Sequence, residues 1–209
     1  MTTPAWRPRR VHRAWLVAGV TLVALIAAGA FRATPGVLIL PLQEEFGWTT
    51  ATISFAISVN LLLYGLTAPF AAAVMDRFGV RRVVAAALLL VAAGSASTVF
   101  MTKSWQLVLC WGILVGLGTG SMALVFAATI ANRWFTESRG LVMGILTAGG
   151  AAGQLVFLPA LALLAEGPGW RAASLLVAAA SLAVIPLVLL LLTERPSDVG
   201  LEPYGGPLP

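Results

Sequence analysis

Arg32 is the residue whose type and position point most directly to chemistry. It is the one charged residue in a long apolar run from Ala14 to Leu42. If a helix from Arg13 to Glu44 crosses a bilayer, Arg32 lies about 18 Å from its Glu44 end, inside the membrane. A charge at the bilayer centre costs about 2.5–3.5 kcal/mol on insertion scales. Water, a counter-charge or an interface must therefore compensate it.

Two interpretations of Arg32 stay open. In the first, it binds an anionic substrate in a water-filled cavity, because a planar guanidinium can bind a carboxylate through two hydrogen bonds. In the second, its long side chain reaches the outer interface and binds nothing. Pro35, within one turn, predicts a bend in the helix. The bend either shapes a binding site or only adjusts packing.

Other polar residues share helical faces. Asn60 and Tyr64 are four residues apart, and Thr147 and Gln154 are seven apart, so each pair lies on one side of a helix. Either these side chains line a substrate path, or they hydrogen-bond to neighbouring helices for about 0.6 kcal/mol each. The first reading makes Asn60, Tyr64 and Gln154 candidate substrate-binding residues beside Arg32.

Glycines recur at a spacing of four residues. Gly112, Gly116 and Gly120 do so in one apolar run, and Gly149 and Gly153 in another. Small residues at this spacing let two helix backbones approach closely in lipid. The pattern predicts helix packing rather than a dinucleotide site, which needs a preceding strand and a βαβ unit.

A short charged segment at residues 76–82 forms a second candidate site. Asp76 is predicted at the C-terminal end of a helix, where the helix dipole disfavours an anion. Arg77, Arg81 or Arg82 would compensate by pairing with it, while Gly79 supplies the tight turn. The alternative is that these arginines only anchor the chain at the membrane surface.

Membrane-spanning helices are the elements that must hold these residues. Of 209 residues, 59% are hydrophobic and 10% charged, whereas a soluble domain carries about 25% charged residues. A span needs about 20 apolar residues. Six segments qualify: Ala14–Leu40, Thr50–Val74, Val83–Met101, Trp105–Ala131, Leu141–Ala165 and Ala172–Leu192. We therefore predict an all-α membrane protein with six transmembrane helices over residues 14–193.

Short polar segments flank this transmembrane domain. Residues 1–13 form a basic N-terminus, and residues 194–209 form a Pro/Gly-rich linker with too few apolar residues for a core. Ten of the thirteen basic residues lie on one side of the predicted spans. They are Arg7, Arg9, Arg10, Arg13, Arg77, Arg81, Arg82, Arg133, Arg139 and Arg195. By the positive-inside rule, we expect both termini in the cytoplasm. We expect the protein to lie in the cell (inner) membrane.

Several function classes are excluded by composition. Cys110 and His12 are the one cysteine and the one histidine, so we predict no metal site and no cofactor. The net charge of +5 comes from short arginine clusters rather than a continuous basic face, which argues against nucleic acid. An intramembrane enzyme would need paired His, Asp or Glu within the spans, and the predicted spans have none.

Residues 72–82 resemble the signature of the major facilitator superfamily between its second and third helices. That signature is a glycine, three residues, Asp-Arg, one residue, a glycine and then basic residues. It is matched here by Asp76, Arg77, Gly79, Arg81 and Arg82, with Ala72 in place of the leading glycine. The resemblance implies a gating loop, which forms a charge clamp with a neighbouring helix and stabilises one state of an alternating-access cycle.

Two further stretches are similar to the monocarboxylate and oxalate/formate antiporter branch of that family. They are Phe31–Val37 with Phe46-Gly47-Trp48, and Arg133-Trp134-Phe135 followed by Arg139-Gly140. The resemblance implies one N-terminal six-helix half of a secondary transporter for a small organic anion, a mono- or dicarboxylate. Its partners would be membrane lipid and a C-terminal six-helix half or a second copy. The alternative is a six-helix membrane scaffold or partner subunit that does not transport.

Overall fold

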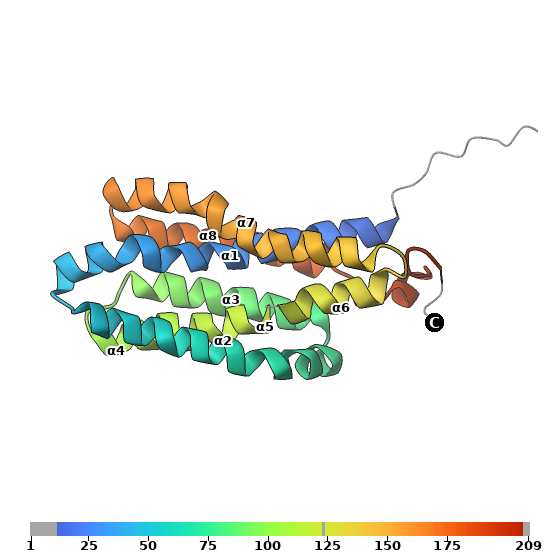
Figure 1. Cartoon of the computed structure of the whole chain (residues 1–209), viewed down its shortest axis with the longest axis horizontal. Helices are drawn as coiled ribbons and strands as arrows, with labels where there is room; N and C mark the ends of the chain where they lie inside the picture. The colour runs from blue at the N-terminus through green and yellow to red at the C-terminus, as the bar shows by residue number, and fades with distance from the viewer. Residues whose placement is uncertain (1–11, 123, 207–209) are drawn as a thin grey trace, which may run out of the picture.

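The computed structural model describes residues 12–122 and 124–206, most of which are helical (Figure 1). The helices are α1 (Arg13–Phe46), α2 (Thr50–Phe78), α3 (Val80–Thr98), α4 (Ser104–Leu107), the π-helix η1 (Val108–Val115), α5 (Gly116–Ser121), α6 (Leu124–Trp134), α7 (Arg139–Glu166), α8 (Trp170–Leu191) and the 3-10 helix η2 (Pro196–Val199). Within the described residues, β-type pairing is limited to one isolated bridge between Phe135 and Tyr204.

In this part of the chain, six helical segments are long and apolar enough to cross a membrane. Five are the single helices α1, α2, α3, α7 and α8. The remaining one, Ser104–Trp134, is built from α4, η1, α5 and α6 in succession. The six segments correspond one to one with the predicted spans, so the predicted all-α, six-span fold is confirmed.

Glycine and threonine residues set the tight connections between the first three spans. Gly47 ends α1 with a left-handed φ of 66°, and the Thr49 hydroxyl accepts a hydrogen bond from the N–H of Thr52 at the start of α2. Only Gly79, with φ of 88°, separates α2 from α3. The charged segment 76–82, predicted as a loop, is therefore almost entirely helical.

Helix α1 lies in the centre of the bundle and packs along α7 and α8 (Figure 1). Helix α3 packs against α8, η1 and α5, while α2 packs against η1 and α5. The start of α1 and the segment after α8 lie at the same end of the bundle. We call this end the arginine-rich end, because it holds Arg13, Arg77, Arg81, Arg82, Arg133, Arg139 and Arg195.

The glycine-rich part of the fourth span is held closely between α2 and α3. A Cβ added at Gly116 would lie 3.1 Å from the carbonyl oxygen of Asn60 in α2. A Cβ added at Gly118 would lie 2.7 Å from the carbonyl oxygen of Ala87 in α3. Backbone thus packs on backbone on two sides, which agrees with the glycine spacing.

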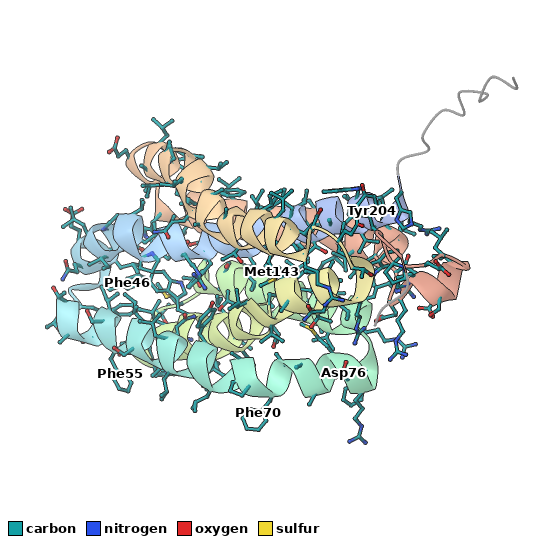
Figure 2. The ribbon with its side chains drawn as sticks, turned by 45° about the vertical axis from the view of Figure 1, so that its right-hand side comes forward. Phe46, Phe55, Phe70, Asp76, Met143 and Tyr204 are labelled. Atoms are coloured by element: carbon teal, nitrogen blue, oxygen red, sulfur yellow. The ribbon has the colours of Figure 1, made fainter. Side chains whose placement is uncertain are left out.

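Helices α2 and α7 expose large apolar faces. In Figure 2, Phe55 and Phe70 of α2 point away from the bundle, and their side chains are 61% and 67% exposed. On α7, Leu155 and Leu163 are 71% and 72% exposed. Within this chain, nothing described covers these faces, so they are open to lipid or to another protein.

The segment after α8 packs onto the bundle. The N–H of Tyr204 donates to the Trp134 carbonyl (2.8 Å), and the Tyr204 carbonyl accepts from the N–H of Thr136 (2.9 Å). The Tyr204 ring contacts Trp15 and Phe135, with ring centroids 5.7 and 5.9 Å apart. The sequence predicted no core here because apolar residues are few. Backbone hydrogen bonds and the packing of Tyr204 and Val199 help to attach the described residues 194–206 instead.

Candidate functional site

Arg32 on α1 reaches toward α2. Its guanidinium carbon lies 4.7 Å from the centre of the Tyr64 ring, which is a cation–π arrangement. The side chain is exposed, and none of the ion pairs among the described residues includes it. An aromatic face attracts a cation without neutralising it, so the charge of Arg32 remains able to bind an anion.

Two cavities share Arg32, Tyr64 and Thr119 in their walls. The first has a volume of about 340 Å³ and lies between α1, α2 and the fourth span, with Phe31 and Trp111 in its walls. The second, of about 290 Å³, extends from Arg32 toward α6 and α7. Among the described residues, Arg32 is the one charged side chain lining either cavity. The shared wall therefore has a single positive charge in largely apolar surroundings.

Asn60 lies beside Tyr64 in the wall of the first cavity. Its side-chain nitrogen donates a hydrogen bond of 2.6 Å to the Trp111 carbonyl in the π-helix η1. The interhelical hydrogen bond that the sequence left open is therefore present. The side chain also borders the cavity, and its carbonyl oxygen makes no described bond, so binding by Asn60 stays a prediction.

Gln154 lies apart from this group. Its side chain on α7 is exposed and lines neither cavity, whereas Thr147, seven residues earlier, lines the second. The face of α7 that carries both residues therefore borders the second cavity at Thr147 but not at Gln154. The structure does not bring Gln154 together with Arg32, Asn60 and Tyr64.

Sequence reasoning missed Trp111 and Thr119 as cavity residues. Trp111 is almost completely buried, and its ring meets Phe31 edge to face at 5.7 Å. The Thr119 hydroxyl donates to the Val115 carbonyl in its own span. In the sequence, both residues look like ordinary packing residues of an apolar helix. Nothing in the sequence pattern marks them as cavity residues.

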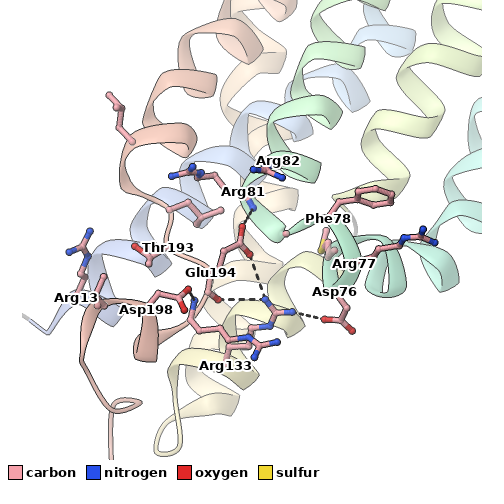
Figure 3. Close-up of a pocket in the computed structure, with 16 residues that line it drawn as sticks. Arg13, Asp76, Arg77, Phe78, Arg81, Arg82, Arg133, Thr193, Glu194 and Asp198 are labelled. Atoms are coloured by element: carbon pink, nitrogen blue, oxygen red, sulfur yellow. Dashed lines mark hydrogen bonds and ion pairs between the residues drawn. The ribbon is translucent and has the colours of Figure 1, made fainter.

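Asp76 belongs to an ionic network at the arginine-rich end that is centred on Arg133 (Figure 3). Its carboxylate lies 2.5 Å from an Arg133 nitrogen of α6. The same guanidinium lies 3.8 Å from the Glu194 carboxylate, just after α8. The sequence proposed Arg77, Arg81 or Arg82 as the partner of Asp76, and that proposal is wrong for this structure. The pairing is instead with a neighbouring helix, as the resemblance implied.

Glu194 also caps the start of α3. Its carboxylate oxygens accept hydrogen bonds from the N–H groups of Val80 (2.7 Å) and Arg81 (3.0 Å). An anion at a helix N-terminus satisfies free N–H groups and is favoured by the helix dipole. One carboxylate thus joins the end of α8 to the α2–α3 turn and, through Arg133, to α6.

The other residues of the charged segment 76–82 lie around this network. Arg77 lies over the Phe78 ring at 5.4 Å, and Gly79 faces Glu194 so closely that a Cβ there would meet its carboxylate. Arg81 and Arg82 are exposed on the first turn of α3. Their side chains make no ion pair within the part of the chain that the structure describes.

The opposite end of the bundle has its own ion pair. Arg171 at the start of α8 donates to both carboxylate oxygens of Glu45 at the end of α1, at 3.1 and 2.6 Å. Trp170 donates its indole N–H to the same carboxylate, and Arg171 stacks on the Trp170 ring at 4.4 Å. These contacts tie α1 to α8 far from the Arg32 cavities.

Comparison with known proteins agrees with this architecture. The sequence profile described as Major Facilitator Superfamily matches residues 20–206. The chain is 31% identical over 181 residues to monocarboxylate transporter 11 of Homo sapiens, covering 85% of this chain and 38% of that protein. It is 25% identical over 188 residues to the uncharacterized MFS-type transporter YcxA of Bacillus subtilis (strain 168), covering 90% and 46%.

A third relative is monocarboxylate transporter 3 of Rattus norvegicus, 34% identical over 169 residues, which are 78% of this chain and 33% of that protein. The chain thus spans less than half the length of each of these relatives. The profile match, six membrane-length helices and the matched charged segment agree with one another. The chain is a multi-pass membrane protein that belongs to the major facilitator superfamily.

Proposed function

We propose that this chain is one six-helix half of a secondary transporter that moves a small organic anion, a mono- or dicarboxylate, by alternating access. The observation that carries the proposal is the position of Arg32. Among the residues that the structure describes, it is the single charge in the walls of two cavities, and it stacks on Tyr64. Monocarboxylate transporters among the relatives support an acid as the substrate.

Arg32 would bind the carboxylate through its planar guanidinium, held in place by the Tyr64 ring. Asn60 would contribute through its side-chain carbonyl, because its amide nitrogen is bonded to Trp111. The apolar residues Phe31 and Trp111 would contact the carbon part of the substrate. A cavity of about 340 Å³ suits an anion with a few carbon atoms.

A second six-helix unit would complete the transporter. The exposed apolar faces of α2 and α7 support this, as does the chain's coverage of 33–46% of its relatives. The unit would be a C-terminal half or a second copy. The gate would be Asp76, Arg77, Gly79, Arg81 and Arg82 with Arg133 and Glu194, placed in the cytoplasm by the positive-inside rule. A reporter active only in the cytoplasm, fused after residue 209, tests that orientation.

Anion binding by the purified chain tests the proposal. We expect calorimetry in detergent to detect L-lactate or oxalate, whereas the neutral analogue lactamide does not bind. Removing a charge-assisted hydrogen bond costs about 1.5–3 kcal/mol, so Arg32→Ala should weaken binding at least tenfold. Arg32→Lys keeps the charge but loses the planar guanidinium, so its affinity for the acid should lie between that of the parent and that of Arg32→Ala.

Arg171→Lys is the matched control, because Arg171 also stacks on an aromatic ring but lies at the end remote from the cavities. It should keep parental affinity. If Arg32→Ala and Arg32→Lys both bind as the parent does, Arg32 is an interfacial anchor and the proposal fails. If neither acid binds the parent, with or without a co-expressed second half, the non-transporting scaffold is favoured.

A further inference from the structure

A third cavity, of about 680 Å³, opens at the arginine-rich end and is lined by six arginines and three carboxylates (Figure 3). In Figure 3, Arg13 lies on one side of it and Asp76 and Arg77 on the other, with Glu194 and Arg133 between them. The arginines therefore outnumber the carboxylates, so the walls of this cavity carry a net positive charge.

The three carboxylates are already engaged by protein groups. Asp76 is paired with Arg133, and Glu194 contacts Arg133 and accepts two backbone N–H groups at the start of α3. Asp198 accepts the backbone N–H of Arg195. None of the described ion pairs includes Arg13, Arg81 or Arg82. These three exposed guanidiniums come from the starts of α1 and α3, and all line the same cavity.

Apolar side chains continue from these arginines toward the membrane interior. Leu190 of α8 lines the cavity and is 77% exposed. On α3, Ala86 and Leu89 follow Arg82 at four and seven residues, so they lie on the same exposed face. Leu190 lies in the last turn of α8, and α8 packs along α3. The arginines thus lie where an apolar surface of the bundle begins.

We propose that Arg13, Arg81 and Arg82 bind the phosphate group of an anionic phospholipid, with an acyl chain lying along α3 and α8. Guanidinium forms paired hydrogen bonds with phosphate oxygens. Basic pockets between membrane helices are suited to lipid headgroups. A soluble phosphate would use the arginines but leave Leu190 and Leu89 without a role. The adjoining charged and apolar surfaces fit a ligand that has both parts.

The site is separate from the Arg32 cavities, so it can be tested independently of the transported anion. The probes are palmitoyl-oleoyl phosphatidylglycerol and the zwitterionic phosphatidylcholine with the same acyl chains. Native mass spectrometry of the purified 209-residue chain would measure the fraction bound at each lipid concentration. We expect phosphatidylglycerol to bind at least tenfold more tightly than phosphatidylcholine.

Each arginine should contribute about fivefold to the affinity for phosphatidylglycerol. The double variant Arg81→Gln/Arg82→Gln should therefore bind about 25-fold more weakly. Arg13→Gln, on another helix, should lose about fivefold and provides a second test if the double variant does not fold. Arg139→Gln is the matched control, because Arg139 lies at the same end of the bundle but does not line this cavity.

Three results would overturn the proposal. Equal binding of the two lipids would show that the headgroup charge is not recognised. A loss in Arg139→Gln as large as that in the double variant would show a general effect of positive charge. Displacement of phosphatidylglycerol by 10 mM inorganic phosphate, a concentration on the order of that used in buffers, would assign the arginines to a soluble anion. Retained lactate binding in Arg13→Gln, a residue outside the proposed gate, would keep this outcome distinct from failure of the proposed transport.

Discussion

The crossing of α1 and α7 provides a sharp test of the packing, because two nearby glycines of α7 have opposite surroundings. A Cβ added at Gly153 would lie 2.3 Å from the carbonyl oxygen of Ile26 in α1, where ordinary contact begins at 3.4 Å. A Cβ added at Gly150 would meet nothing within 4 Å, because this residue borders the second cavity. The same chemical change three residues apart should therefore have opposite effects on stability.

The magnitude follows from these distances. In Gly153→Ala the helices must separate by about 1 Å, because the obstacle is backbone and cannot rotate away. Overpacking of this kind costs about 1–3 kcal/mol, and we expect the upper end. Alanine also favours the helix by about 1 kcal/mol over glycine. Gly153→Ala should thus destabilise by about 2 kcal/mol, and Gly150→Ala should stabilise by up to about 1 kcal/mol.

Thermal unfolding in detergent, followed by circular dichroism, measures both variants against the parent. For a chain of about 200 residues, 1 kcal/mol shifts Tm by about 2–4 °C. We expect Tm to fall by about 4–8 °C in Gly153→Ala and to stay level or rise slightly in Gly150→Ala. Equal Tm values for the two variants would refute the close approach of α1 and α7 at Gly153.

Three further predictions concern the arginine-rich end. Asp76→Asn should lower Tm by no more than about 2–4 °C, because an exposed ion pair contributes at most about 1 kcal/mol to stability. The same variant should lower flux once a second half is supplied. Unchanged flux would mean that the segment only anchors the chain at the membrane surface. Glu194→Ala should cost about 1–2 kcal/mol in thermal unfolding, because α3 loses its cap, and Glu194→Gln should cost less. Tyr204→Ala should speed cleavage by endoproteinase Asp-N before Asp198, while Tyr204→Phe keeps the ring contacts and should be cleaved like the parent.

The fold could be predicted from the sequence because its elements are long and their solvent is lipid. Apolar runs separated by arginines or glycines define six spans. Only their ends were misjudged, since the segment 76–82, predicted as a loop, is helical except at Gly79. The detail within the fourth span could not be predicted. Its helices include the π-helix η1, and Gly116 and Gly118 pack against α2 and α3 through contacts that are non-local in sequence.

The candidate site was predictable where one residue stood out by itself. An isolated charge in an apolar run singled out Arg32, and helical spacing placed Asn60 and Tyr64 on one face. The partners of Asp76 could not be deduced in this way. Arg133 is 57 residues away, and its own contact with Glu194 spans another 61. Helical periodicity carries no information about contacts over such separations.

The cap on α3 has a consequence for how the chain is made. Glu194 accepts its hydrogen bond from Val80 across 114 residues of sequence. During synthesis, α3 leaves the ribosome long before the carboxylate that completes its first turn. The arginine-rich end therefore cannot assume its final arrangement until α8 has been translated and inserted. In chains that stop before Glu194, the first N–H groups of α3 lack the carboxylate that accepts their hydrogen bonds in the full chain.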